Sequence, residues 1–271
     1  MNIRTYFSKL ITFSFLFVIF SCSTNHEINS KNENLSSTSV EKEEFNEESS
    51  FIQENKEIKQ NKKNQKDTIT KAKQTDFKQL VDIQTLNSSI LIDLKYASED
   101  NFMKQRLYFD IDKVFLQKDV AERLAKVQEY LKELRPDLTL LVYDGVRPLS
   151  VQKAMWKALD TIPVKDRVKF VSNPASGSIH NYGAAVDLTI AQNNGKALDM
   201  GAGYDDIREI AYPRMENYFL QKGELTNQQI ENRKLLRKVM KSQNFTNIPT
   251  EWWHFNACSR NEAKIKYKIL Q

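Results

Sequence analysis

Residues 178–187 read SIHNYGAAVD, and this stretch decides how the chain of 271 residues is interpreted. Gly177 and Gly183 bracket His180, which predicts an irregular turn with close backbone approach. From 184 to 190 the side chains alternate in character, as they do along a strand. The stretch therefore predicts a histidine held at a turn that leads directly into a β-strand.

Asp187 lies within that predicted strand, on the face opposite Val186 and Leu188. A carboxylate among apolar residues is unfavourable to bury unless it is paired or bound to a metal. Taken alone, the aspartate also fits a hydrogen-bonded turn, and His180 alone fits a core histidine with satisfied ring nitrogens. Neither residue is decisive by itself.

A second short motif, EWWHF at 251–255, supplies another histidine. The sequence holds three histidines, and the third, His26, falls in a polar stretch near the N-terminus. Glu251 and His254 oppose one another on a regular strand, so a bend or bulge is needed to bring both to one site. An aromatic core strand with two polar edge residues is the alternative interpretation.

His180, Asp187 and His254 together form a donor set for a metal. Neutral imidazole is the commonest metal ligand, and a catalytic zinc takes three protein ligands plus one open position. Glu251 beside this set supplies a general base. These residues therefore predict one Zn²⁺ per chain and a hydrolytic site.

Arg147 follows the predicted strand 138–143, within the sequence YDGVRP at 143–148. An arginine presented after a glycine turn can stabilise an oxyanion as its charge develops. The alternative is a salt bridge at the strand end.

These motifs resemble a known family. The pattern Ser-x-His-x-x-Gly-x-Ala-x-Asp, followed at a distance by Glu-x-x-His, is similar to that of the zinc D,D-peptidases, which share a fold with the sonic hedgehog N-terminal domain and the lysostaphin-type enzymes. Within that group, DGVRP at 144–148 and EWWH at 251–254 resemble the VanX-type D-alanyl-D-alanine dipeptidases, as does DLKYA at 93–97. The resemblance covers about 78–270.

The resemblance implies a role for each matching residue. His180, Asp187 and His254 match the zinc ligands. Glu251 matches the catalytic general base and acid, and Arg147 matches the residue that stabilises the tetrahedral intermediate.

Two further matches concern the substrate. Ser178 matches a serine that contacts it, and Asp205 matches the aspartate that meets its ammonium group, with Asp206 as the neighbouring alternative. The implied reaction is zinc-dependent hydrolysis of the D-Ala-D-Ala dipeptide, linked to turnover of cell-wall peptides.

Two other functions use the same residues. A D,D-carboxypeptidase acting on peptidoglycan stem peptides needs the same metal chemistry in a more open cleft. A non-catalytic, zinc-stabilised module that binds the cell wall needs only the fold and the metal, and the presence of Glu251 and Arg147 argues against it.

The first 22 residues are predicted to be a lipoprotein-type signal peptide. Arg4 and Lys9 precede the mostly apolar run 11–20, which is too short for a transmembrane helix. A small residue followed by Cys22 then resembles a lipobox, so Cys22 is expected to carry lipid, and an ordinary signal peptide is the alternative. We therefore expect an exported, membrane-anchored lipoprotein with its catalytic domain in the periplasm or cell envelope.

Residues 23–75 are predicted to be a disordered polar tether, because they have too few apolar side chains to offset the entropy of ordering. All seven glycines and all six prolines lie beyond this segment. Residues 76–271 are therefore expected to form a single zinc dipeptidase domain. The two cysteines, Cys22 and Cys258, cannot make a disulfide framework. Cys258 is expected to be a buried free thiol, because a fourth protein ligand would close the zinc site.

The domain is predicted to be α+β, with a central antiparallel sheet flanked by helices. Its expected helices are 119–134, 149–159 and 226–242, where apolar residues recur at helical spacing or follow a proline. Its expected strands are 88–96, 138–143 and 184–190.

Charge sets limits on the partners. The formal net charge of +5 arises from 40 Lys+Arg against 35 Asp+Glu, and no basic stripe lies near the motifs, so a nucleic-acid partner is not expected. The expected partners are a small D,D-dipeptide substrate and, through the lipid, a membrane. No protein partner is evident.

Overall fold

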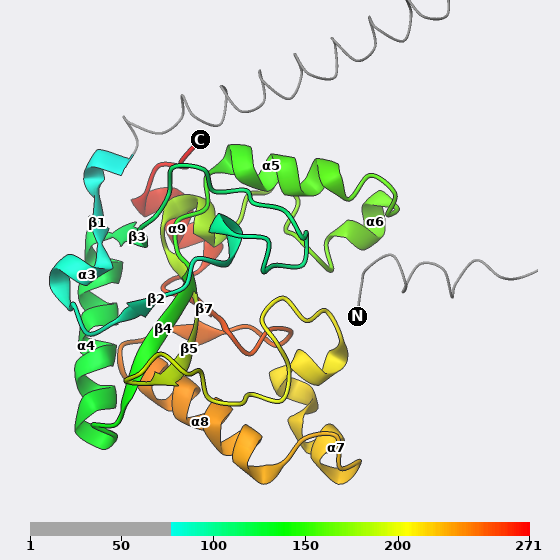
Figure 1. Ribbon diagram of the computed structural model, residues 1–271. Coiled ribbons are helices and arrows are strands. Elements are labelled where there is room, and N and C mark those ends of the chain that lie inside the picture. The colour runs from blue at the N-terminus through cyan, green and yellow to red at the C-terminus, as the bar shows by residue number, and fades with distance from the viewer. Residues whose placement is uncertain (1–76) are drawn as a thin grey trace, which may run out of the picture. The chain divides into compact units, whose positions relative to one another are not determined.

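The computed structural model describes residues 77–271 (Figure 1). The predicted signal peptide at 1–22, the lipidated Cys22 and the predicted tether at 23–75 lie outside the described residues. Within 77–271, no helix is both long enough and apolar enough to cross a membrane.

A five-stranded sheet forms the centre of the described region. Its order is β2-β4-β5-β7-β6, with the bounds β2 (Leu91–Ile92), β4 (Leu138–Asp144), β5 (Ala185–Gln192), β7 (His254–Asn256) and β6 (Thr246–Asn247). β2 runs parallel to β4, and the other neighbouring pairs of this sheet are antiparallel. The predicted α+β class with a central antiparallel sheet is confirmed, with one parallel pair at its edge.

The two long strands β4 and β5 are buried on both faces. All residues of β4 are buried, and β5 is buried up to its last residue, Gln192. The alternation along 184–190 therefore does not mark a solvent-facing side of the sheet. Asp144 and Asp187 end the β4–β5 pairing, after a register shift beyond Val142. Both carboxylates lie inside the core, where each needs polar partners.

Helices α4 (Lys118–Leu134) and α8 (Asn227–Ser242) match two of the predicted helices. They contact each other, and α4 packs on β4 while α8 packs on β5. Each buries one face at helical spacing, as expected for an amphipathic helix. In α4 that face consists of Val120, Leu124, Val127 and Leu131.

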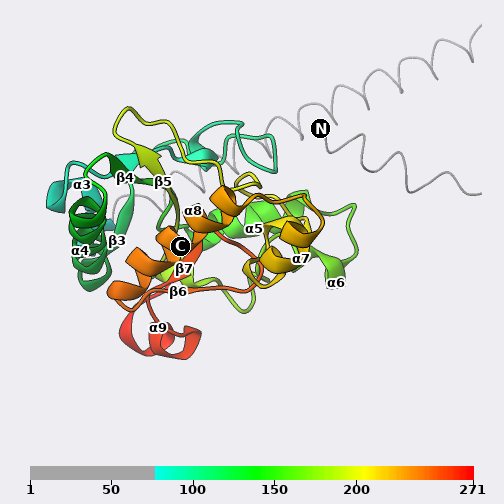
Figure 2. The same ribbon diagram turned by 90° about the horizontal axis from the view of Figure 1, so that it is seen from below.

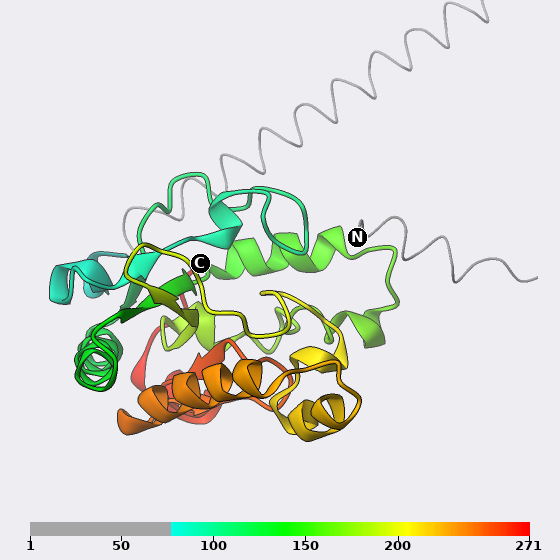
Figure 3. The same ribbon diagram turned by 60° about the horizontal axis from the view of Figure 1, so that its bottom comes forward.

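Helix α5 (Leu149–Ala158) begins after Pro148, as predicted. In the view of Figure 3, strands β5 and β7 lie between α5 and α8. Figure 2 views the same elements from below. The other helical segments that follow β4 in the chain are α6 (Val164–Arg167), η3 (Ile179–Tyr182), η4 (Glu209–Ala211), η5 (Pro213–Met215), α7 (Glu216–Gln221) and α9 (Arg260–Lys266).

The N-terminal part of the described region differs from expectation. It forms η1 (Phe77–Gln79), α3 (Ile83–Leu86), η2 (Lys95–Ala97) and a two-stranded antiparallel sheet of β1 (Leu80–Asp82) and β3 (Phe115–Gln117).

The predicted strand 88–96 is wrong over most of its length, because only Leu91–Ile92 pairs with the sheet. The chain then turns into η2. The Tyr96 carbonyl accepts the N–H groups of Leu107 and Tyr108, each at 2.8 Å. This turn buries Tyr96 beside the site described below.

Candidate metal centre and substrate pocket

The turn that carries His180 is a single stretch of 3₁₀ helix with a capping box. Ser178 Oγ accepts the backbone N–H of His180 at 3.3 Å, and Asn181 Oδ1 accepts the N–H of Ser178 at 2.6 Å. Gly183 ends the helix at φ +64°, a left-handed conformation that favours glycine. The irregular turn expected from the two glycines is therefore the device that holds the buried imidazole in place.

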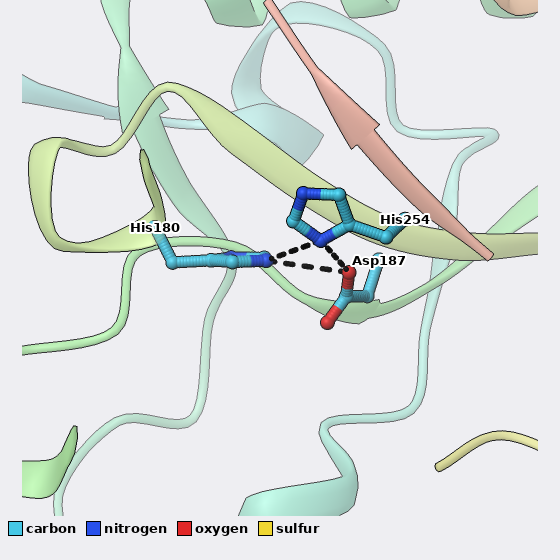
Figure 4. Close-up of side chains that lie close together, drawn as sticks. All are labelled: His180, Asp187 and His254. Carbon is cyan, nitrogen blue, oxygen red and sulfur yellow. Dashed lines mark hydrogen bonds and ion pairs between the residues drawn. The ribbon is translucent and has the colours of Figure 1, made fainter. Parts of the chain in front are cut away.

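Asp187 and His254 reach the same point from neighbouring strands. They are direct partners in the antiparallel pairing of β5 with β7. Asp187 Oδ1 lies 2.9 Å from His254 Nδ1 and 3.3 Å from His180 Nε2, and the two ring nitrogens are 3.1 Å apart. Figure 4 shows the two rings and the carboxylate pointing toward one another. The predicted donor set is therefore assembled in space.

The outer nitrogens of both rings face oxygen acceptors. His180 Nδ1 donates to the carbonyl oxygen of Gly145 at 2.7 Å, and His254 Nε2 donates to Asn256 Oδ1 at 2.8 Å. A proton held on each outer nitrogen leaves the lone pair of each inner nitrogen directed at the common point. Such partners orient the histidines of metal sites in this way.

The donor geometry fits a small divalent cation. Bonds of about 2.0–2.1 Å in tetrahedral arrangement place ligand atoms about 3.3 Å apart, close to the separations seen here. Within 77–271, His180, Asp187 and His254 make up the group of ligating residues that can hold a metal.

The pKa values of the donor residues also favour a cation at this position. Burial lowers the pKa of His254, but the hydrogen bond and charge of Asp187 outweigh it and raise that pKa to about 9. Burial also acts on Asp187, in the upward direction, yet the two histidines hold its pKa well below the usual range. The centre of the site therefore favours positive charge.

Glu251 stands at the edge of this centre. Residues 252–253 form a bend between Glu251 and β7, so the departure from regular strand geometry that the motif required is present. Glu251 Oε2 lies 3.9 Å from His254 Nδ1, and its side chain is 35 % exposed. Burial in the pocket wall raises the pKa of Glu251, and the positive charge of His254 opposes that effect. A reachable carboxylate with a raised pKa is suited to proton transfer.

Arg147 is held by a buried carboxylate. Its Nε and Nη2 lie 3.0 and 2.7 Å from Asp144 Oδ2, and Tyr108 donates its hydroxyl to Asp144 Oδ1 at 2.7 Å. Nη2 is also 3.5 Å from Asp187 Oδ2. The alternative of a salt bridge at the strand end is therefore present, and it fixes a positive charge next to the donor set. The role of Arg147 in stabilising an oxyanion stays a prediction.

Asp205 lines a pocket of about 220 Å³ together with Glu251 and Trp253. Its carboxylate accepts the Tyr96 hydroxyl at 3.2 Å and the Phe102 N–H at 3.4 Å, which are neutral donors. Burial raises the pKa of Asp205 well above its ordinary value, and the nearby charge of Asp187 adds to this.

Asp206 differs in its partner. Its Oδ1 accepts the Nε–H of Arg208 at 2.9 Å, and its Oδ2 accepts a hydrogen bond from Arg208 Nη2. The structure thus distinguishes the two adjacent aspartates. Both aspartates line the pocket, but the carboxylate of Asp205 has neutral donors, whereas the charge of Asp206 is balanced by Arg208.

The model of the D-ala-D-ala dipeptidase family, peptidase family M15, matches residues 76–269. The chain belongs to this family. The resemblance seen in the motifs is confirmed.

Three curated D-alanyl-D-alanine dipeptidases illustrate the relationship. The protein of Escherichia coli K12 is 33% identical over 181 residues, which cover 67% of this chain and 86% of that protein. The protein of Enterococcus faecalis V583 is 30% identical, covering 60% of this chain and 83% of its own length. The protein of Streptomyces coelicolor is 27% identical, covering 64% and 88%. A solved LD-carboxypeptidase is more distant, at 17% identity and a TM-score of 0.32 over 70% of this chain and 72% of its own, and adds nothing to the assignment.

Several residues that build the site of this M15 peptidase were not singled out from the sequence. Asp144 lies within the DGVRP motif, where the sequence alone indicates no role for it. Tyr96 lies within the DLKYA motif at 93–97, which carried part of the resemblance without a role for the tyrosine. Tyr108 and Tyr204 reach the site from segments distant in the chain, and no local pattern marks them. Asn256 could have been predicted from the sequence. It stands two residues after His254, and a polar side chain at that spacing on a strand shares the face of the proposed ligand.

Two residues behave differently from their expected description. Cys258 is a free thiol, as predicted, but it is half-buried rather than buried. Ser178 uses its hydroxyl oxygen as the cap of η3. Its contact with substrate stays a prediction.

Proposed function

We propose that this chain is a zinc-dependent D-alanyl-D-alanine dipeptidase. The observation that carries the proposal is the place of Glu251, which borders both the three metal donors and the pocket that contains Asp205. A proton-transfer group at that junction is what hydrolysis of a short peptide requires. The dipeptidases named above, which share its family, support the choice of substrate.

His180, Asp187 and His254 would hold the zinc, and two neutral imidazoles with one carboxylate leave the ion a net positive charge. When bound, zinc polarises a scissile carbonyl and makes water more acidic. Other residues of the chain transfer the proton, stabilise the developing charge and bind the substrate.

Glu251 moves the proton. Its carboxylate accepts a proton from the attacking water and passes it to the nitrogen of the leaving D-alanine. Arg147, fixed by Asp144, keeps a positive charge where negative charge grows on the carbonyl oxygen, so no reorganisation is needed during the reaction.

Asp205 selects the free amino end. Its carboxylate, poorly satisfied by neutral donors, pairs with the ammonium group of the dipeptide. The volume of about 220 Å³ suits a short substrate rather than a polymer strand. Ser178 is proposed to contact the substrate from the turn that carries His180.

Hydrolysis assays on two substrates test this proposal. The zinc-loaded protein is expected to release D-alanine from D-Ala-D-Ala and to leave a pentapeptide stem intact, and a chelator should stop the release. Release from the pentapeptide alone would instead indicate a D,D-carboxypeptidase. Binding to cell walls without hydrolysis of either substrate would indicate a non-catalytic module.

We also propose that the chain is exported and anchored to a membrane by lipid on Cys22, with residues 23–75 as the tether. The apolar run 11–20 and the small residue before Cys22 support this. Mass spectrometry of the mature N-terminus tests it. A diacylglycerol-modified Cys22 is expected, and an unmodified N-terminus at another residue would exclude the anchor.

A further inference from the structure

The loop 199–211 carries two adjacent residues that reach different targets. The Tyr204 hydroxyl donates to Asp187 Oδ2 at 3.1 Å. Asp205, the next residue, faces the pocket. One segment of chain therefore touches both a metal-ligating carboxylate and the space where the substrate is proposed to bind.

The two carboxylate oxygens of Asp187 have different partners. Oδ1 faces His254 and His180, at 2.9 and 3.3 Å. Oδ2 is turned to Tyr204, and the second donor near it, Arg147 Nη2, is farther away at 3.5 Å. Asp187 is only 2% exposed, so burying its Oδ2 without a close hydrogen-bond donor would destabilise the folded protein. Tyr204 is thus its principal partner.

We propose that Tyr204 is a positioning residue for the metal centre. Its hydroxyl holds the outer oxygen of Asp187, so that Oδ1 alone is presented to the ion. A carboxylate bound through one oxygen can rotate about its last bond, and a donor on the other oxygen stops that rotation. This inference rests on the proposed metal site and goes beyond it.

The Tyr204 ring is itself fixed by aromatic packing. Its centroid lies 5.1 Å from that of Tyr143, 5.4 Å from Trp253 and 6.2 Å from Tyr96. Tilted and edge-on contacts of this kind favour one ring orientation. Trp253 is adjacent to the ligand His254, so the packing joins the loop to the strand that delivers the ligand.

Arg233 holds the loop at both ends. This fully buried side chain donates through Nε to the Met200 carbonyl at 2.7 Å and through Nη2 to the Ile210 carbonyl at 3.0 Å. Asp205, at φ +60°, adopts a left-handed conformation that is unfavourable for a residue with a side chain. Such conformations persist where the surrounding structure holds them, and Arg233 supplies that restraint.

The test replaces Tyr204 by phenylalanine, which removes one oxygen and keeps the ring. Tyr143→Phe is the matched control, because Tyr143 packs on the same ring and is not placed against Asp187. Zinc affinity is measured for both variants and the wild type by competition with a chelating dye. Circular dichroism checks that each variant is folded.

Tyr204→Phe is expected to bind zinc about 10- to 100-fold more weakly than the wild type, and Tyr143→Phe is expected to match the wild type. Equal affinity in Tyr204→Phe and the wild type would overturn the role of Tyr204 and leave the metal site standing. A wild type that does not bind zinc would overturn both the metal site and the positioning role.

Discussion

Asp187 and His254 are direct partners across the antiparallel strands β5 and β7, and this pairing places Oδ1 and Nδ1 2.9 Å apart. Two of the three proposed ligands are therefore positioned by the backbone ladder rather than by flexible loops. His180 completes the set from a capped turn. A site built on regular elements keeps its geometry whether or not a substrate is present.

The charge balance of this centre predicts a pH effect on the chelator-treated protein. The pKa of His254 is about 9 in the fold, above the ordinary 6.5 of an unfolded histidine. Protonated His254 therefore stabilises the folded state. This contribution to the free energy of unfolding is fully present below pH 6.5 and is lost as the pH rises through 9. Urea unfolding of the metal-free protein should thus show a loss on the order of 3 kcal/mol over that interval.

His254→Gln is the control for that measurement, because it removes the titrating group. Its unfolding free energy should vary much less between pH 6.5 and 9. A wild-type curve as flat as that of the variant would contradict the assigned pairing of His254 with Asp187.

Asp144→Asn is expected to destabilise the protein and reduce hydrolysis. It leaves the buried Arg147 guanidinium without its closest carboxylate partner, a change that typically costs about 3–5 kcal/mol. Chemical denaturation and steady-state kinetics measure the two effects. Asp137→Asn is the control, because Asp137 pairs with Arg135 at the same 2.7 Å distance but on the surface, where ion pairs contribute little.

Asp205→Asn is expected to raise KM for the dipeptide about 10- to 100-fold, because a hydrogen bond to a charged group contributes about 1.5–3 kcal/mol. Steady-state kinetics on D-Ala-D-Ala provide the measurement. Asp206→Asn should leave KM close to that of the wild type, since Asp206 is paired with Arg208. A larger effect from Asp206 than from Asp205 would reverse the assignment.

Arg233→Lys is expected to raise KM and weaken zinc binding together. Lysine keeps the charge beside Glu216 but lacks the planar fork that reaches both loop carbonyls. Arg237→Lys is the matched control, because Arg237 binds the same Glu216 and is not bonded to the loop ends. Equal effects of the two substitutions on KM would show that the Glu216 network, and not the loop, matters.

The grouping of His180, Asp187 and His254 was predictable from the sequence, because these residue types are unusual where they stand. Their role as ligands, and the role of Glu251, stay predictions. A histidine between two glycines and an aspartate within an apolar strand both need an explanation. The helices 118–134 and 227–242 were predictable for a related reason, since their apolar residues recur at helical spacing over several turns.

The remaining parts depend on contacts between distant residues. Tyr204 meets Asp187 only because the loop 199–211 folds back over the sheet, and Tyr96 meets Asp205 across 109 residues. The strand expected over 88–96 forms only at Leu91–Ile92, because the chain turns into η2 at Tyr96. Apolar character alone does not distinguish a sheet edge from a buried turn.

The central claim is that Glu251 transfers the proton at a zinc site. Hydrolysis of D-Ala-D-Ala and bound zinc are measured together in the wild type and in Glu251→Gln, which keeps the size of the side chain. We expect one zinc per chain in both proteins and a kcat at least about 10²-fold lower in the variant. Wild-type hydrolysis by a zinc-loaded Glu251→Gln protein would contradict it.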